Sequence, residues 1–219
     1  MSGGDALALD HLVLAAASLD AGVRWCEEEL GITPGPGGRH PLMGTHNRLF
    51  GIASAAYARA YFEIIAIDPQ APTPRGKRWF GLDEIDLRAG PRLLHAVARC
   101  TALDERLAAL RAAGCDEGVP IAASRDTAYG LLAWRIAVRD DGRLLCGGAL
   151  PSLIEWGSVH PADALPASGV TLHSLALRGL PKAAVHALNW PGVEFAADAG
   201  PALAATMDTP RGRIALHSL

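Results

Sequence analysis

Two histidines and two glutamates interrupt apolar stretches of this sequence, and these residue types can carry acid–base or metal chemistry. His11 and His95 each lie in the middle of a short apolar stretch, while Glu63 and Glu155 lie in later ones. An ionised carboxylate in a buried strand costs several kcal/mol unless a cation or a hydrogen-bond network compensates it. We therefore expect each glutamate to have such a partner.

The two histidine stretches belong to an internal repeat. The spacing from His11 to Leu19 recurs without a gap from His95 to Leu103, and an aspartate follows each leucine. In both copies an apolar run of strand length leads into a segment with helical periodicity. The duplication predicts two structurally equivalent units in one chain.

The first unit starts with a strand and a helix. Residues 8–15 are predicted as the strand, Ser18 as the helix N-cap, and residues 19–30 as the helix, which ends at Gly31. A loop rich in glycine and proline follows, and further strands are predicted at residues 44–53 and 57–67.

The second unit repeats this order, and a shorter third copy follows it. A strand is predicted at 92–100, a helix at 103–113, and strands at 131–138 and 150–156, with Asp140-Asp-Gly142 as a hairpin turn. Strand alternation in the last of these turns Glu155 toward the site and Trp156 toward the core, and we expect His160 to lie in a loop. The third copy has its histidine strand at 171–177, a helix at 181–189, and strands near 192–197, 203–207 and 212–217.

Duplicated units that open on a histidine strand and close on a glutamate strand resemble the vicinal oxygen chelate superfamily. This superfamily includes glyoxalase I, extradiol dioxygenases and methylmalonyl-CoA epimerase. Five motifs within residues 8–160 are similar to its glyoxalase-like domain branch: Leu9-Asp-His-Leu-Val13, Gly37-Gly-Arg-His-Pro41, Gly44-Thr-His-Asn47, Tyr61-Phe-Glu-Ile-Ile65 and Pro151-Ser-Leu-Ile-Glu-Trp156.

The resemblance implies an α+β fold. Tandem βαβββ units would form a cupped mixed sheet with helices outside and a partial third unit. We expect the first unit at residues 1–68, a connector at 69–91, the second unit at 92–165, and the partial third unit at 166–219, packed on the same domain.

The resemblance also implies a metal centre. In the superfamily the ligands come from the first and last strands of each unit, which here are His11, Glu63, His95 and Glu155. That set suits an octahedral divalent ion such as Zn, Ni, Mn, Fe or Co. Glu63 or Glu155 is the expected catalytic acid–base residue. The glycine-bearing loop and the strand that follows it offer four substrate-binding candidates, Arg39, His40, His46 and Asn47.

These features predict a divalent-metal-dependent isomerase or lyase that acts on a small oxygenated substrate through a chelated enediolate-type intermediate. The alternative is a metal-free protein of the same fold that sequesters a small ligand. A weaker alternative is an extradiol-type dioxygenase, whose two-histidine, one-carboxylate site leaves the second glutamate without a role.

Composition limits the partners. The net charge of −3, with both signs interspersed, argues against nucleic acid, and no apolar run approaches the roughly 20 residues that span a membrane. The first residues lack the basic and apolar regions of a signal peptide. We expect a cytoplasmic monomer or homodimer with a small-molecule partner, in which the four cysteines, without a CxxC pair, are buried apolar residues.

Overall fold

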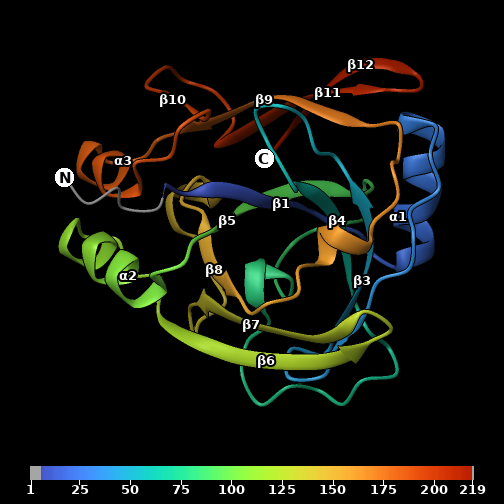
Figure 1. Cartoon of the computed structure of the whole chain (residues 1–219), viewed down its shortest axis with the longest axis horizontal. Helices are drawn as coiled ribbons and strands as arrows, with labels where there is room; N and C mark the ends of the chain where they lie inside the picture. Colours follow the sequence, from blue (N-terminus) through green and yellow to red (C-terminus); the bar gives the residue numbers. More distant parts are fainter. Residues whose placement is uncertain (1–5, 219) are drawn as a thin grey trace.

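Two antiparallel strands, β1 (Ala8–Ala15) and β5 (Arg92–Arg99), form the centre of an eight-stranded sheet. The computed structural model describes residues 6–218. In each half the central strand pairs in parallel with the last strand of its unit, so the duplication predicted from the sequence is also a duplication of topology. Outward from β1 come β4 (Tyr61–Ile67), β3 (Thr45–Gly51) and β2 (Arg39–His40), and outward from β5 come β8 (Ser152–Trp156), β7 (Gly130–Val138) and β6 (Val119–Thr127) (Figure 1).

The first helix forms where its capping residues predict. α1 (Leu19–Trp25) begins after Ser18, whose side chain accepts a hydrogen bond of 3.1 Å from the Ala21 amide. The helix continues through a π-helical turn at Cys26–Leu30 and ends at Gly31, whose φ of 75° favours glycine. The matching helix of the second unit, α2, covers Leu103–Ala112. No helix among the described residues is long and apolar enough to cross a membrane.

One strand of the second unit was not predicted. β6 alternates between exposed and half-buried residues and carries few large apolar side chains, so its apolar signal is weak. The tight hairpin joins β6 to β7 through Ala128 and Tyr129. The Asp140–Gly142 turn instead opens a longer connection, with a 3-10 turn at Leu145–Gly148, before β8 pairs antiparallel with β7.

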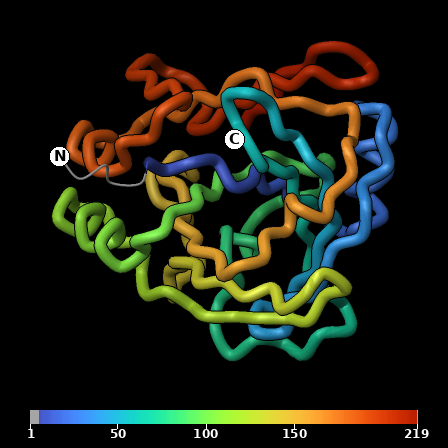
Figure 2. The backbone as a smooth tube through the Cα atoms, in the orientation of Figure 1, coloured from blue at the N-terminus to red at the C-terminus, as the bar shows by residue number. Residues whose placement is uncertain are grey.

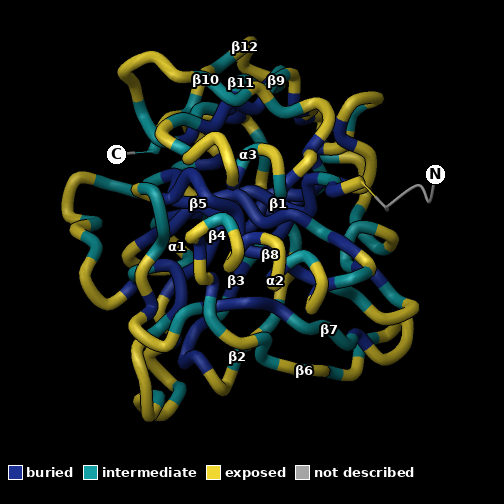
Figure 3. The backbone as a smooth tube through the Cα atoms, turned by 90° about the vertical axis from the view of Figure 1, so that its left-hand side faces the viewer, coloured by how far each residue is buried: buried dark blue, intermediate teal, exposed yellow. Residues whose placement is uncertain are grey.

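The last part of the chain forms its own four-stranded sheet. The order of its strands is β10-β9-β11-β12. One hydrophobic core lies between this small sheet, the helices and the outer face of the large sheet, where the central strands β1, β4 and β5 are almost entirely buried (Figure 3). The elements are β9 (Thr171–Arg178), α3 (Lys182–Leu188), β10 (Glu194–Ala196), β11 (Leu203–Thr209) and β12 (Gly212–His217).

The connector between the two units, whose path Figure 2 traces, packs on the face of the large sheet that carries Val13 and Val97, which we call the concave face. Its 3-10 turn, Trp79–Gly81, buries Trp79 and Phe80 in a second core together with Val13 and Val97. We call this second cluster the concave core. The connector therefore helps to decide which polar side chains on this face reach a cavity.

Together these elements confirm the predicted α+β fold of curled, duplicated units with an additional small sheet.

Candidate functional site

His11 and Glu63 meet on the concave face of the large sheet. Parallel pairing sets His11 beside Tyr61 and Val13 beside Glu63. The His11 Nε2 atom lies 3.4 Å from Glu63 Oε2, and both residues are buried. The Tyr61 ring stacks on the imidazole with ring centres 4.7 Å apart. This half of the predicted ligand set is brought together.

Asp10 reaches the same site through a β-bulge. In the pairing with β5, Leu9 opposes Ala98 and His11 opposes Val97, which leaves Asp10 as the extra residue. A bulge interrupts strand alternation, so neighbouring side chains can approach each other. Asp10 Oδ1 accepts a hydrogen bond of 2.7 Å from His11 Nδ1. Sequence reasoning missed this residue, although an aspartate inside an apolar run is itself a signal.

The second carboxylate oxygen of Asp10 binds two residues from the end of the second unit. Trp156 Nε1 and His160 Nε2 each donate to Oδ2 at 2.9 Å. The Ala162 amide donates to His160 Nδ1, which fixes the remaining imidazole proton on Nε2. His160, predicted as a loop residue, is buried and joins the two halves of the protein at Asp10.

The paired carboxylates determine the charge of His11. Burial alone would lower the pKa of His11, but the hydrogen bonds and charges of Asp10 and Glu63 raise it to about 9. The same contacts lower the pKa of both carboxyl groups, although burial acts in the opposite direction. At neutral pH the site therefore holds an imidazolium between two carboxylates.

This pairing predicts a pH-dependent stability. The pKa of His11 is about 9 in the folded chain against 6.5 for a free imidazole, so its contribution is complete below pH 6.5 and is lost as the pH rises through 9. We expect the free energy of unfolding to fall by up to roughly 3 kcal/mol across that window. Urea titrations at several pH values would measure the fall, and His11→Gln should lack it. An identical fall in the variant would contradict the assignment.

Asn47 on β3 holds Glu63 from the other side and is itself held by the glycine-bearing loop. Asn47 Nδ2 donates a hydrogen bond of 2.6 Å to Glu63 Oε1, and its Oδ1 accepts one of 2.6 Å from the Gly38 amide. A Cβ at Gly37 would collide with the Asn47 backbone, so glycine is required for this approach. Of the four predicted substrate-binding residues, Asn47 is in the network.

His40 lines the cavity above the His11–Glu63 pair, whereas Arg39 lines only its outer neighbour and His46 lines neither. Burial lowers the pKa of His40 to about 4, so it is neutral, and its Nδ1 lies 3.1 Å from Thr45 Oγ1. Arg39 and His46 face Asp68 at 3.2 and 3.9 Å. Alternation along the β2–β3 pair separates these neighbours onto opposite faces.

His95 occupies the place of His11 in the second unit, but both of its ring nitrogens are already hydrogen-bonded within the protein. Its Nδ1 donates to the Gly148 carbonyl at 3.1 Å, and its Nε2 accepts from the Ser152 amide at 2.9 Å. Burial lowers the pKa of His95 to about 4, and the Phe80 ring lies 5.5 Å from the imidazole. Both ring nitrogens are occupied, so His95 has no lone pair left for a metal.

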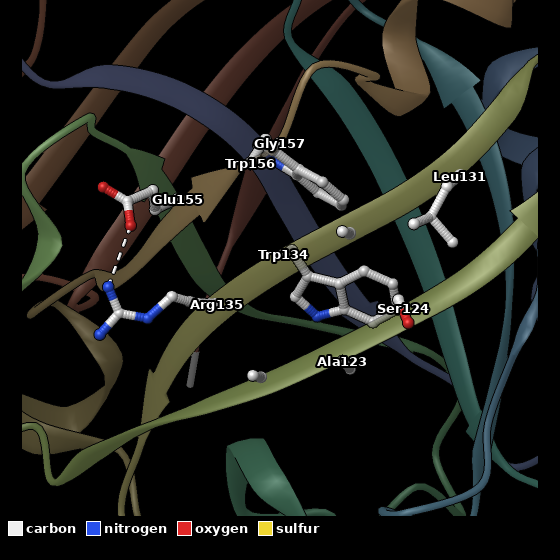
Figure 4. Close-up of a pocket in the computed structure, with 10 residues that line it drawn as sticks. Ala123, Ser124, Leu131, Trp134, Arg135, Glu155, Trp156 and Gly157 are labelled. Carbon is white, nitrogen blue, oxygen red and sulfur yellow. Dashed lines mark hydrogen bonds and ion pairs between the residues drawn. The ribbon is translucent and has the colours of Figure 1, made fainter.

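The predicted role of Glu155 needs a correction. It lines one surface pocket together with Trp134 and Trp156, but its side chain points away from their indoles, which pack against the concave core, and forms an ion pair of 3.1 Å with Arg135 (Figure 4). Pairing sets Val97 beside Ser152 as it sets Val13 beside Glu63. The structural counterpart of Glu63 is therefore Ser152, whose Oγ lies 3.1 Å from His95 Nε2.

These residues do not fit the four-ligand metal centre. Across residues 6–218, no group of three or more histidine, cysteine, aspartate or glutamate side chains is arranged to hold a metal ion. His11 and Glu63 are neighbours, but His95 is fully hydrogen-bonded and Glu155 faces the other side of the sheet.

Two neighbouring cavities, which we call the inner and the outer chamber, share part of their lining, and His11 and Glu63 line the inner one. The inner chamber has a volume of about 40 Å³ and is lined by His11, Asn47, Tyr61 and Glu63 from the first half and by apolar side chains from the second. The outer chamber, of about 440 Å³, contains Arg39, Arg125 and mainly apolar residues. Both chambers are lined by His40, Trp79, Trp134 and Ile136. The arrangement suits a small polar group on a larger, partly apolar molecule.

Comparison with known proteins agrees with this architecture. The family model described as a glyoxalase-like domain matches residues 9–191. A hypothetical protein from Staphylococcus aureus has a TM-score of 0.57 and 15% identity, over 97% of this chain and 86% of its own. Methylmalonyl-CoA epimerase from Mycobacterium tuberculosis has a TM-score of 0.40 and 18% identity, over 72% and 91% of the two chains. No curated protein matches the chain.

The duplicated units and the polar pair beneath a small cavity define a small-molecule enzyme or binding protein of the vicinal oxygen chelate superfamily. Within that superfamily, the chain belongs to the glyoxalase-like domain family.

Proposed function

We propose that this protein is a glyoxalase-type isomerase or lyase that moves a proton on a small oxygenated substrate. The supporting observation is the Glu63 carboxylate, held 3.4 Å from the His11 imidazolium in the lining of the inner chamber. The carboxylate can take a proton from carbon. The imidazolium can donate a hydrogen bond to the adjacent oxygen, where negative charge develops.

Substrate binding would make Glu63 a stronger base. In the free protein its hydrogen bonds to His11 and Asn47 keep its pKa low. When a substrate oxygen accepts the hydrogen bond from His11 Nε2, Glu63 loses one of its two donors. Burial then acts on a less compensated carboxylate and raises its pKa. Glu63 therefore becomes a strong enough base to take a proton only when the substrate oxygen that His11 stabilises is in place.

The second half of the protein contributes the apolar wall of this site. Trp134, Ile154 and Trp156 line the inner chamber opposite the polar pair. Charges act more strongly in such a low-dielectric environment than in water. The chamber has room for a carbonyl and its neighbouring carbon, and the rest of the substrate would occupy the outer chamber.

The same geometry bears on two other functions, extradiol ring cleavage and sequestration of a small ligand. The extradiol reaction needs two histidines and a carboxylate on one iron ion, and His95 is committed to Gly148 and Ser152. Sequestration of a small ligand without chemistry is the stronger alternative, because the outer chamber is mainly apolar. Sequestration needs binding but no exchange of substrate protons.

Hydrogen exchange at carbon tests the proposal without knowledge of the product. The protein would be incubated in deuterium oxide with small 2-oxo acids, α-hydroxy ketones and β-dicarbonyl compounds, and NMR would follow deuterium entering next to the carbonyl. We expect exchange faster than with heat-unfolded protein, and we expect chelator-treated protein to retain it. Ligand binding with no exchange in the whole panel would instead favour sequestration.

A further inference from the structure

Arg125 carries a charge into the outer chamber from the far half of the protein. It lies on β6, the edge strand of the second unit, and lines the chamber beside His40 and Trp134. Its guanidinium rests on the loop of the first unit, since a Cβ at Gly38 would coincide with Nη1. The side chain therefore bridges the two halves of the sheet above the site.

The Arg125 guanidinium is not satisfied within the protein. Its Nη1 atom is buried without a hydrogen-bond partner among the described residues. The charges of Tyr61 and Glu63 favour the charged form of the guanidinium, but neither residue forms a hydrogen bond with it. A buried donor without a partner costs about 1–3 kcal/mol, and more when it is charged. Because this donor has no acceptor in the protein, the guanidinium can turn toward an acceptor in the chamber without losing a hydrogen bond at Nη1.

Arg39, the other arginine of the chamber, is already committed. It donates a hydrogen bond of 2.7 Å to Gln70 and lies 3.2 Å from Asp68. The chamber thus offers one unpaired cation, which matches a group with a single negative charge. A phosphate dianion would require a second cation. The planar fork of a guanidinium also matches the two oxygens of a carboxylate.

We propose that the outer chamber binds the carboxylate of an amphipathic organic acid, with Arg125 as its anchor. Leu42, Met43, Ile121 and the two chamber tryptophans would contact the apolar body of the acid. Arg125 is a binding residue in this assignment, because it touches the substrate at a distance from the reacting carbon. The assignment deepens the proposed function, on which it rests, by naming the substrate class.

Equilibrium binding tests this assignment separately from catalysis. The probes are 4-methyl-2-oxopentanoate and its neutral carboxamide, and the signal is the fluorescence of Trp79 and Trp134, which line the chamber. We expect the carboxylate to bind the wild-type protein at least about tenfold more tightly than the amide, as one charged hydrogen bond predicts. Arg125→Met should abolish that preference, so that the acid and the amide bind the variant with similar affinity.

Two further variants complete the experiment. Gly38→Ala should displace the guanidinium without removing its charge and should also weaken carboxylate binding. Arg135→Met is the matched control, because Arg135 lies on the neighbouring strand and pairs with Glu155 and Asp104 on the other face. Its affinity for the carboxylate should equal that of the wild type.

The outcomes distinguish the two proposals. If the carboxylate does not bind, or binds no better than the amide, the role of Arg125 is overturned. If neutral carbonyl compounds undergo exchange but acids do not bind, the proposed function stands, and Arg125 is not a carboxylate anchor. If acids bind through Arg125 and none of the compounds undergoes exchange, the anchor is real and the proton-transfer reaction is not.

Discussion

Glu63→Gln is expected to lower the rate of carbon hydrogen exchange by about 10²- to 10⁴-fold, the usual contribution of a general base. Glutamine keeps the shape of the side chain and can still accept one hydrogen bond, but it cannot take a proton. It also removes one of the two carboxylates that raise the pKa of His11. Both functions proposed for the polar pair are therefore impaired by one substitution. Deuterium incorporation followed by NMR measures the effect.

The matched control for this result is Glu155→Gln. Glu155 was the other carboxylate candidate, but it pairs with Arg135, and a Leu103 amide donates to it at 3.4 Å. We expect the exchange rate of this variant to remain within about twofold of the wild type, because Glu155 pairs with Arg135 and does not line the inner chamber. A large loss in Glu155→Gln, or none in Glu63→Gln, would remove Glu63 from its assigned role.

Asp10→Asn is expected to lower the free energy of unfolding by about 3–5 kcal/mol, the usual cost of breaking a buried charged pair. The Asp10 carboxylate is fully buried and accepts from His11, Trp156 and His160. In asparagine an NH2 group replaces one carboxylate oxygen, so one of the three donors loses its acceptor. The positive charge of His11 also loses one of its two carboxylate partners. Urea unfolding followed by tryptophan fluorescence at pH 7 would measure the loss.

The control for this substitution is Asp126→Asn. Asp126 lies exposed on β6, and a change there should stay within about 0.5 kcal/mol. If Asp10→Asn unfolds at the same urea concentration as the wild type, the network around Asp10 contributes far less than its geometry indicates.

The strengths and errors of the sequence interpretation have a common origin. Capping by Ser18 and termination at Gly31 depend on nearby backbone groups, so local sequence is enough to predict them. The His11–Glu63 pair was predicted from the family motifs, and the register of β1 with β4 sets it in place. The placement of Glu155 failed, because the motif alone does not reveal which face of β8 joins the concave core.

The sequence by itself determined the duplication and most of the elements, since spacing, periodicity and capping are local properties that repeat along the chain. The α+β fold and the family followed from the motifs that resemble the glyoxalase-like domain branch. The tertiary structure decided which polar residues form the site. A bulge turns Asp10 toward His11, the connector places Phe80 against His95, and Arg125 reaches Gly38 from the opposite half. Each of these contacts joins distant strands or depends on how β1 pairs with β5, so no local pattern contains it.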